Sequence, residues 1–429
     1  MNHTNANQPV SAVIVGAGQR AMIYASYALK HPDRLRIVGV AEPDAARRRL
    51  AASLHGIPES QCFDSVHALT AGPKLADAAI NGTMDRLHVE TTLPLLDAGY
   101  HVLLEKPMGI HMEEIDRLRE AAQRTKRVVM ICHVLRYAPF YAAIRRAIAS
   151  GEIGDIVNIQ TAEHVSYHHM AVSFVRGKWS SEEQCGSPML LQKCCHDLDI
   201  IAWLMNGVKP VRVGSFGALV HFRPERAPEG AGMRCLADCR IEDSCPYSAR
   251  KQYIERDTWN FHVWGNFDLG LRRSEEEMYR LLRDESPYGR CVWHSGNDVV
   301  DRQSVIMEFE NGCTATHNMV GGAAKSYRTL HIVGTKGDIQ GNLEDGYFEI
   351  RKPDTSVKAG YTSARTDISV TDDSHGGGDL RLVEDFVQVL QGGEPSLSYT
   401  ALEESVYGHA IAFAAERSRK GRRLEELKL

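Results

Sequence analysis

Two short motifs, about ninety residues apart, carry residue types suited to redox chemistry on a bound nucleotide. One runs Val-Ile-Val-Gly-Ala-Gly-Gln-Arg-Ala over residues 13–21, and the other runs Val-Leu-Leu-Glu-Lys-Pro over residues 102–107. The first has the Gly-x-Gly-x-x-Ala pattern of a strand–turn–helix unit that binds a dinucleotide. The second places Lys106 after an apolar strand, where an ammonium can stabilise charge on a reacting oxygen. Together they predict hydride transfer involving a nicotinamide.

Each small residue of the first motif has a predicted task. Gly16 permits a tight turn, Gly18 lets the backbone approach a pyrophosphate, and Ala21 lets helix and strand pack closely. Gln19 and Arg20 lie between them and complete the predicted cofactor contact. The pattern by itself occurs in many unrelated sequences, so it needs support from the strands that follow.

The next apolar stretch provides that support. Residues 36–41 end at Glu42, which stands 24 residues after Gly18. An acidic residue near this spacing accepts hydrogen bonds from the adenosine ribose hydroxyls. Its carboxylate repels a 2′-phosphate, so we expect NAD rather than NADP. Three arginines at 47–49 could bind such a phosphate, although a solvated helix face is the simpler interpretation.

Strand and helix patterns then alternate to about residue 150. Strands are expected at 78–81, 101–104 and 128–133, with helices at 87–98 and 112–124. This alternation predicts a doubly wound parallel sheet, in which ligands bind at the carboxyl ends of the strands. The residues predicted at those ends, and therefore around the cofactor, are Gly16, Glu42, Gly82, Thr83, Glu105 and Lys106.

The whole chain sets limits on the function. Its 429 residues predict two domains, 1–150 and 151–429, and 43% hydrophobic with 24% charged residues is typical of a globular protein. A net charge of −5 gives no reason to expect a nucleic acid partner. No apolar run is long enough for a membrane helix, and the polar first residues lack the pattern of a signal peptide. We therefore expect a cytoplasmic protein without a membrane partner.

The second domain contains a predicted helix over residues 189–204. Gln192, His196 and Asp199 share one side of it at i, i+4 and i+7 spacing. A histidine titrating near neutrality suits a general base, although a lone histidine on a helix is more often structural. Partial burial is expected to lower the pKa of Lys106 and to let it relay a proton. Residues 304–319 predict a β-hairpin around Asn311-Gly312.

These motifs, with Arg-Tyr-x-Pro at 136–139, Gly-Glu-Ile-Gly at 151–154 and His-x-x-Asp at 196–199, have the order and spacing of one known family. The chain resembles the Gfo/Idh/MocA oxidoreductases over its first domain and from about 150 to 420, apart from about 222–295. The resemblance implies a Rossmann domain followed by an α+β domain with a large open, mainly antiparallel sheet. It also implies a homodimer or homotetramer that uses the exposed face of that sheet.

Within this resemblance, Lys106 contacts cofactor and substrate, and His196 takes the hydroxyl proton. Gln192 departs from the family, which usually has aspartate at that position, so the expected catalytic set is only partly matched. We assign Gln192 and its neighbour Lys193 to substrate binding. A polar and aromatic cluster after strand 156–162 suits a sugar, and its candidates are His164, His169, Arg176 and Trp179.

A cysteine-rich insertion interrupts the second domain at about residues 222–295. Cys235, Cys239 and Cys245, with Cys291 or a histidine as a fourth ligand, could hold a structural zinc ion. The spacing is not a standard Cys-x-x-Cys pair, and separate thiols would give the same pattern. Ten cysteines in a cytosolic chain favour thiols or metal ligands over disulfides.

The predicted function is NAD-dependent oxidation or reduction of a secondary alcohol on a sugar, glycoside or cyclitol. One alternative is a glycosidase or lyase in which transient oxidation acidifies a neighbouring C–H before elimination. The other is a non-catalytic NAD-binding regulator, which the glutamine at position 192 would favour. The first alternative predicts cleavage without net NADH, and the second predicts cofactor binding without turnover.

Overall fold

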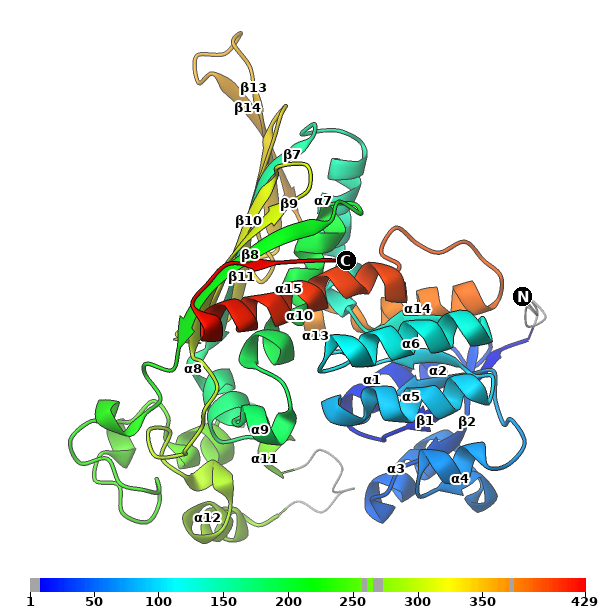
Figure 1. Ribbon diagram of the computed structural model, residues 1–429. Coiled ribbons are helices and arrows are strands. Elements are labelled where there is room, and N and C mark those ends of the chain that lie inside the picture. Colours follow the sequence, from blue (N-terminus) through cyan, green and yellow to red (C-terminus); the bar gives the residue numbers. More distant parts are fainter. Residues whose placement is uncertain (1–7, 257–260, 265–272, 370–373) are drawn as a thin grey trace.

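A computed structural model describes residues 8–256, 261–264, 273–369 and 374–429 (Figure 1). The first sheet has six strands in the order β3-β2-β1-β4-β5-β6, all pairing in parallel. Its strands are β1 (Val10–Val15), β2 (Leu35–Ala41), β3 (Cys62–Phe63), β4 (Ala78–Asn81), β5 (His101–Leu104) and β6 (Val129–Ile131). These strands are almost wholly apolar because helices bury both faces of the sheet. The predicted doubly wound domain is therefore present.

Helices connect and cover these strands. They are α1 (Gln19–Ala25), α2 (Tyr27–Lys30), α3 (Ala45–His55), α4 (Val66–Thr70), α5 (His88–Asp97) and α6 (Met112–Thr125). A helix from the far end of the chain, α14 (Asp379–Leu390), also packs here, because Phe386 and Val387 share one apolar cluster with Ile14 of β1. The amide of Ile131 donates to the carbonyl of Thr400 at 3.1 Å, which extends the edge of the sheet. The C-terminal part of the chain thus completes the first domain.

The second sheet has nine strands in the order β14-β13-β12-β11-β7-β10-β9-β8-β15. Only β7 and β10 pair in parallel, so the sheet is mainly antiparallel as expected. Its strands are β7 (Ile156–Ser166), β8 (Pro210–Ala218), β9 (Arg302–Phe309), β10 (Thr314–Ala323), β11 (Tyr327–Gly334), β12 (Asp338–Asn342), β13 (Tyr347–Pro353), β14 (Tyr361–Asp367) and β15 (Glu425–Glu426). The predicted hairpin is β9–β10, and Gly312 supplies the positive φ of 82° in its turn.

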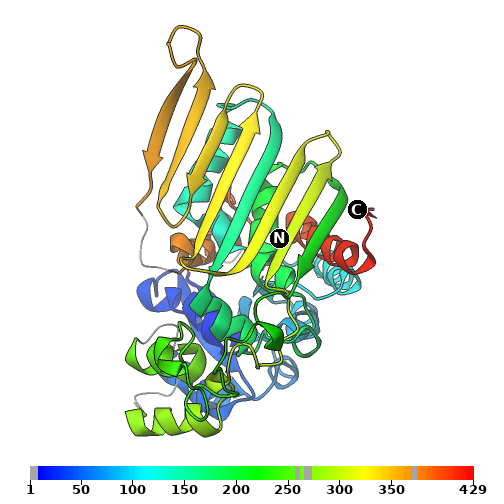
Figure 2. The same cartoon turned by 90° about the vertical axis from the view of Figure 1, so that its left-hand side faces the viewer.

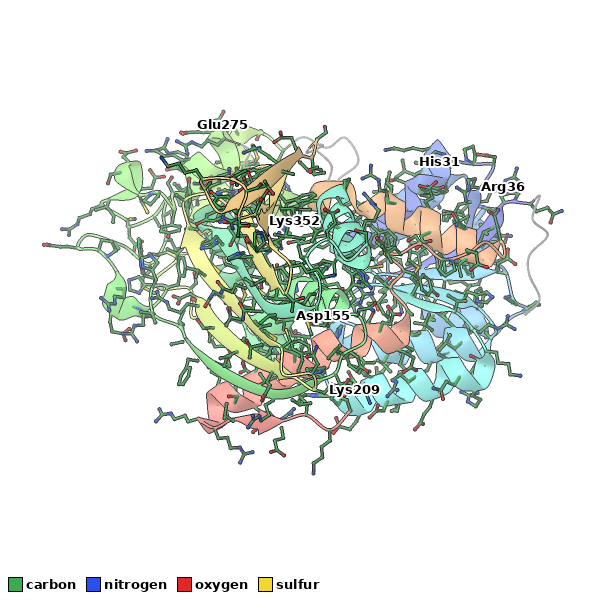
Figure 3. All side chains as sticks on the ribbon, turned by 90° about the horizontal axis from the view of Figure 1, so that it is seen from above. His31, Arg36, Asp155, Lys209, Glu275 and Lys352 are labelled. Atoms are coloured by element: carbon green, nitrogen blue, oxygen red, sulfur yellow. The ribbon has the colours of Figure 1, made fainter. Side chains whose placement is uncertain are left out.

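One face of this sheet is covered and the other is open. Helices α7 (Pro139–Ala149), α10 (Met189–Leu204) and α15 (Leu402–Gly421) lie behind the sheet when its open face is viewed (Figure 2). Strand β9 alternates exposed and buried residues accordingly. Seen from above, Lys352, Asp155 and Lys209 follow one end of the sheet, with His31 and Arg36 of the first domain to one side (Figure 3).

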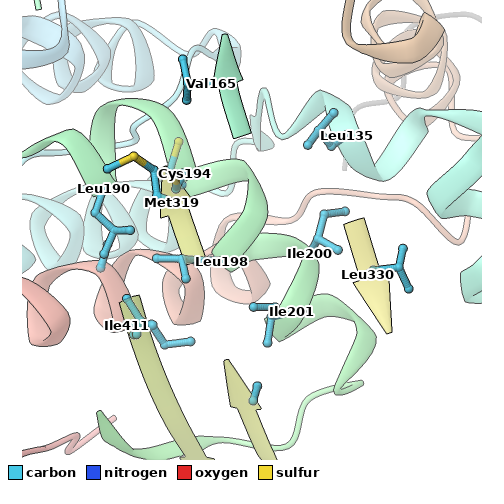
Figure 4. Packing of buried hydrophobic residues seen from close by; sticks show 14 of the residues in the cluster. Leu135, Val165, Leu190, Cys194, Leu198, Ile200, Ile201, Met319, Leu330 and Ile411 are labelled. Carbon is cyan, nitrogen blue, oxygen red and sulfur yellow. The ribbon is translucent and has the colours of Figure 1, made fainter. Parts of the chain in front are cut away.

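Helix α10 is central to the second core. Figure 4 shows its apolar residues packed between the sheet and α15, and the labelled contacts are Leu190, Cys194, Leu198 and Ile201 with Val165, Met319, Leu330 and Ile411. Pro188 precedes the first turn of α10, and because proline has no backbone N–H, it leaves no unpaired donor there. Fifteen of the 16 residues of α10 are buried, which fixes the side chains that the helix carries.

The cysteine-rich insertion lies between β8 and β9 in the chain and below the second sheet in Figure 1. Its core is a separate cluster of Cys235, Ala249, Tyr253 and Leu282 against Val172. The remaining short helices are α8 (Tyr167–His169), α9 (Glu182–Cys185), α11 (Phe261–Trp264), α12 (Glu275–Asp284) and α13 (Ser374–Gly377). Within the described ranges, every helix is too short or too polar to cross a membrane.

Candidate active site

The glycine motif forms a turn that touches the end of β4. Gly16 has φ of 76°, and a Cβ at this position would lie 2.8 Å from the Thr83 amide nitrogen. A Cβ on Gly82 would lie 2.8 Å from the Cβ of Ala21. Both glycines are therefore required by close packing between the turn and its neighbour. This explains the positions of Gly16 and Ala21 in the motif.

Gly18 differs from Gly16 because space remains above it. A Cβ on Gly18 would have only the Gly82 carbonyl within 4 Å, at 3.7 Å. Its backbone is thus open to a ligand while Gly16 is closed by the protein. Gln19, the next residue, begins α1 and is half-buried. A glycine cradle of this shape fits the pyrophosphate of a dinucleotide.

Glu42 is fixed beside this turn at the end of β2. Its Oε2 accepts a hydrogen bond from the Ala17 amide at 2.7 Å, and its Oε1 accepts one from the Asp44 amide at 2.9 Å. The residue is only 5% exposed. Arg48 donates to the main-chain carbonyl of Glu42. The carboxylate keeps free lone pairs in a place where the ribose of a bound dinucleotide would be expected.

Arg20 joins the glycine motif to the C-terminal helix α14. Its two terminal nitrogens donate to Asp379 at 3.1 and 2.6 Å, and its Nε donates to Glu105 at 3.3 Å. Tyr24 donates to the other oxygen of Glu105 at 3.1 Å. Arg20 and Glu105 stay predicted cofactor contacts, and these bonds fix both side chains in place. A bidentate arginine–carboxylate pair fixes orientation strongly.

Lys106 follows β5 and reaches the second domain. Its Nζ donates to the main-chain carbonyl of Gln192 on α10 at 2.8 Å, and the Lys106–Pro107 peptide is cis. Burial opposes the charge of the ammonium, but Cys195, Glu105 and Asp85 hold the pKa of Lys106 above its usual value. The expectation of a lowered pKa was wrong, because nearby acidic groups outweigh desolvation. Lys106 is therefore a cation that donates hydrogen bonds.

His88 supports the loop that carries this lysine. Its Nδ1 lies 2.5 Å from the Pro107 carbonyl oxygen, and its Nε2 lies 3.0 Å from the Thr83 carbonyl oxygen. The ring is fully buried. It bridges the ends of β4 and β5, and no spacing in the sequence pointed to this contact.

His196 belongs to a group of buried histidines. Its ring centroid lies 5.9 Å from that of His133 and 5.4 Å from that of His375, and His409 lies 5.5 Å from His133. Burial, with the nearby Lys106 cation, lowers the pKa of His196 far below its usual value. The predicted titration near neutrality was wrong, because the ring is only 4% exposed. His196 is neutral at physiological pH and can accept a proton.

The carboxylate of Asp379 lies next to this group of histidines, on the side of His375. The Nδ1 of His375 lies 3.3 Å from Asp379, the same residue that Arg20 binds. Although burial opposes its charge, His375 and Arg20 hold the pKa of Asp379 well below its usual range. The chain thus has an aspartate beside its histidines despite the glutamine at position 192. Sequence spacing could not reveal this, since residues 375–379 lie far along the chain from His196.

Asp199 serves to anchor α10. Its two oxygens accept from the Nε and Nη2 of Arg136 at 2.7 and 2.6 Å, and both side chains are fully buried. A Cβ on Gly408 of α15 would approach the Asp199 Cα to 3.0 Å. The His-x-x-Asp motif therefore combines one chemical residue with one structural residue.

This pairing of Lys106 with a helix that carries His196 can be compared with known proteins. The profile of the Gfo/Idh/MocA oxidoreductases with an NAD-binding Rossmann fold matches residues 10–133, and that of the family's C-terminal α/β domain matches residues 145–429. The chain belongs to this family. It is accordingly an oxidoreductase with an NAD-binding first domain, and the fold and the resemblance predicted from its motifs are confirmed.

The individual family members named next have low sequence identity to this chain. YteT of Bacillus subtilis (strain 168), described only as an oxidoreductase, is 24% identical over 406 residues, 89% of each chain. The inositol 2-dehydrogenase of Corynebacterium glutamicum (strain R) is 26% identical over 192 residues, 44% of this chain and 52% of the relative. The structure of the WlbA dehydrogenase from Bordetella pertussis with NADH and UDP-GlcNAcA has a TM-score of 0.66 at 17% identity, covering 99% of both chains. This structural likeness supports the fold.

Gln192 and Lys193, which were predicted to bind substrate, lie on α10 and bind other groups of the protein. Lys193 donates to Glu163 of β7 at 2.6 Å. The side-chain Nε2 of Gln192 donates to the Ser187 carbonyl at 2.5 Å. The Gln192 Oε1 is buried and accepts no hydrogen bond from any described residue. Gln192 keeps a free acceptor beside Lys106, whereas Lys193 belongs to an ion pair.

His164 and Arg176 lie away from the site. Glu163 points from β7 toward α10, so its neighbour His164 points to the opposite face, where it stacks on Tyr327 at 4.1 Å. Arg176 donates to Cys235 at 3.3 Å and to the carbonyls of Arg290 and Tyr247 at 2.7 and 2.9 Å. The placement of both residues contradicts the predicted contact with substrate. Arg176 instead holds the insertion to the second domain.

His169 and Trp179 both lie beside Phe174, with ring centroids 5.6 and 6.1 Å from its ring. Lys193 and His262 lie close enough to His169 to lower its pKa further than burial alone does. The Trp179 ring is half-buried, with the Lys178 ammonium 4.2 Å from its centroid. Charged and aromatic groups thus surround both residues.

The metal site predicted on the insertion cysteines stays a prediction. Cys235, Cys239, Cys245 and Cys291 are all free. Among the residues that the structure describes, the set with three ligand atoms within 4.8 Å of one another is Cys194, Asp197 and His317 instead. No three sulfur atoms of the insertion cysteines, all four of which the structure describes, lie within 4.8 Å of one another. Cys235 and Cys239 nevertheless lie near enough to Cys245 and Cys291 to contribute, after burial, to the raised pKa of both thiols.

Proposed function

We propose that the protein is an NAD-dependent dehydrogenase of a secondary alcohol on a sugar, glycoside or cyclitol. The observation that carries the proposal is the 2.8 Å hydrogen bond from Lys106 to the Gln192 carbonyl. It joins the strand end of the nucleotide domain to the helix that carries His196. A cation and a neutral base are thereby placed beside each other.

The chain's own groups have complementary tasks in such a reaction. A bound nicotinamide would accept the hydride from the substrate carbon. Lys106 donates a hydrogen bond to the reacting oxygen and stabilises its developing negative charge. The neutral His196 accepts the hydroxyl proton. Asp379, acting through His375, favours the imidazolium that results.

The substrate class rests on relatives and on the side chains near α10. One relative acts on inositol, and a structural neighbour was solved with a nucleotide sugar. His169 and Trp179 supply a polar group and an aromatic face of the kind that binds hydroxyl groups and C–H surfaces. Gln192 Oε1 offers an acceptor for a substrate hydroxyl. These features fit a polyhydroxylated ring.

NAD is the proposed cofactor rather than NADP. Glu42 is held in place by two backbone amides, so its carboxylate cannot easily turn away from the ribose position. A 2′-phosphate would meet that negative charge at close range. Turnover with NADP that equals or exceeds turnover with NAD would contradict this preference.

The first experiment is to follow NADH absorbance while purified protein and NAD are offered sugars, glycosides and inositols, with products identified in parallel. The proposal expects NADH to accumulate with one class and Lys106→Ala to abolish the signal while cofactor still binds. Glycoside cleavage without net NADH would instead support transient oxidation and elimination. Cofactor binding without any product would leave a regulator as the better description.

The open face of the second sheet fits a second copy of the chain. Phe216 of β8 is 82% exposed and Ile306 of β9 is 53% exposed, and both point away from the covering helices. Large exposed apolar side chains on one face commonly mark an association surface. A homodimer or homotetramer is therefore proposed. Light scattering should show Ile306→Arg dissociating it, and a wild-type monomer would refute it.

A further inference from the structure

A second polar group lies on the far side of α10, between the helix and the sheet. Cys194 and Asp197 are one turn apart on α10, and His317 faces them from β10. One ligand atom from each lies within 4.8 Å of the others, and none of the three residues is more than 4% exposed. Figure 4 shows Cys194 beside Met319, two residues along β10 from His317. The family's reaction does not use this group.

One ring nitrogen of His317 carries a proton, and the other is left with a free lone pair. Thr161 donates its hydroxyl proton to the Thr316 carbonyl at 3.3 Å, so it accepts from the Nδ1–H of His317 at 2.9 Å. The opposite nitrogen, Nε2, is then an acceptor. It is buried and has no hydrogen-bond partner among the described residues, and the same is true of the Oδ2 of Asp197.

Two buried acceptors that face one place can both be satisfied by a bound cation. We propose that Cys194, Asp197 and His317 bind a Zn²⁺ ion. Thiolate, carboxylate and imidazole are the ligands that zinc prefers, and a water molecule can take the fourth position. The bond from His317 to Thr161 fixes the tautomer and the orientation of the ring, as outer-shell partners of metal-binding histidines do.

The surrounding charges are consistent with a divalent ion. Arg328 lies 3.0 Å from Asp197 and 2.6 Å from Glu163, while Lys193 lies 2.6 Å from Glu163. Glu344 is a third carboxylate near Arg328. Two cations thus face three carboxylates. A thiolate together with a divalent ion would bring this set to neutrality.

The proposed metal ion would hold α10 in position and would take no part in the reaction. It ties α10 to the sheet on the face opposite His196, and therefore holds the helix that presents His196 to Lys106. It is also distinct from the insertion, whose cysteines lie on another segment. The inference does not depend on the proposed substrate or cofactor.

Metal analysis of the purified full chain tests the inference directly. We expect about one zinc per chain in the wild type, lost in Cys194→Ala and His317→Gln. It should be retained in Cys313→Ala, a matched buried cysteine that precedes β10, and in Cys239→Ser of the insertion. Absence of zinc from the wild type, or zinc lost only with Cys239→Ser, would overturn the proposal.

A second measurement does not depend on whether the variants fold. The wild-type protein is stripped of metal and loaded with Co²⁺, which gives a visible spectrum when bound in a zinc site. We expect a sulfur-to-cobalt charge-transfer band with the intensity of a single thiolate. The band of several thiolates, or none, would contradict a site built on Cys194. Added Zn²⁺ should raise the unfolding temperature of the stripped wild type but not that of Cys194→Ala.

Discussion

The two faces of α10 differ in the charge of their side chains and in the partners of those side chains. On the face toward the first domain, His196 is neutral and its Nδ1 has no hydrogen-bond partner among the described residues. On the face toward the sheet, Lys193, Glu163, Arg328 and Asp197 form a continuous chain of ion pairs. The sheet face binds its charged side chains in ion pairs, whereas the face toward the first domain keeps His196 uncharged. A helix held firmly on one side can present reactive side chains in fixed positions on the other.

The comparison predicts that the faces respond differently to substitution. On the reaction face, His196→Asn should lower kcat/KM by about 10³-fold, because general-base catalysis is worth roughly 10² to 10⁴. The unfolding temperature should change little, since the imidazole makes no hydrogen bond that the fold requires. Steady-state kinetics and thermal unfolding of the same preparation provide both numbers.

His164→Asn is the matched control for that change. His164 lies on the opposite face of the sheet and stacks on Tyr327, so its replacement should leave kcat/KM within about twofold. Equal losses in the two variants would break the comparison, because they would mean that position relative to α10 does not decide function.

The sheet face should show the reverse pattern. Arg328→Met leaves Glu163 and Asp197 buried without their shared partner. Breaking such a pair from one side costs about 3–5 kcal/mol in the free energy of unfolding. Urea unfolding measures this cost, while kcat of the protein that remains folded at low temperature should stay close to the wild-type value.

An exposed pair of the same sheet offers the control. Arg351 binds Asp338 at 2.6 Å, with the two side chains 28% and 27% exposed. Arg351→Met should cost less than about 1 kcal/mol, because solvent screens such pairs. If both variants lost the same stability, burial of the Arg328 network would not be the cause.

The buried histidines predict how stability depends on pH. Burial lowers the pKa of His133, His196 and His375, and that of His409 to about 3. The unfolded chain binds protons at these residues below about pH 6.5 while the folded chain does not. Stability therefore falls as pH decreases from 7 to 5, and each histidine contributes up to about 1.4 kcal/mol per pH unit.

His133→Phe isolates one of these contributions. Neither of its ring nitrogens has a hydrogen-bond partner among the described residues, so an apolar ring of similar size should fit. We expect the mean slope between pH 7 and 5 to decrease by about 1 kcal/mol per pH unit. The depressed pKa of Asp379 acts only below its unfolded value near 4, outside this window. An unchanged slope would mean that His133 is protonated in the folded state.

The sequence predicted the nucleotide site better than the face of α10. Glycine turns and strand ends depend on backbone geometry, so Gly16, Gly82 and Ala21 could be placed from spacing alone. The strand expected over residues 156–162 continues to Ser166, so His164 lies within β7, where side chains alternate between the two faces, and not in a loop after it. The structure brings Lys106 close to α10, the helix that carries His196, and the protonation of both residues depends on burial, which only the folded chain shows.

The pairing of His375 with Asp379 predicts a smaller effect on the reaction face. Asp379→Asn removes the carboxylate that stabilises imidazolium near His196 and should lower kcat by about tenfold. The acid limb of the pH–kcat profile should shift to lower pH, because the neighbouring rings become harder to protonate. A general loss of activity with an unchanged profile would indicate that Asp379 acts only through its bonds to Arg20.

Gln192→Asp should have the smallest effect, and it decides whether the two carboxylate positions are equivalent. In the wild type the change should alter kcat by less than about threefold, because Asp379 already serves the histidines and the Ser187 hydrogen bond is lost. Combined with Asp379→Asn, the same change should recover part of the lost kcat, because it restores a carboxylate one turn before His196. The double variant thus departs from additivity if the positions share one task. Additive effects would mean that positions 192 and 379 do not share one task.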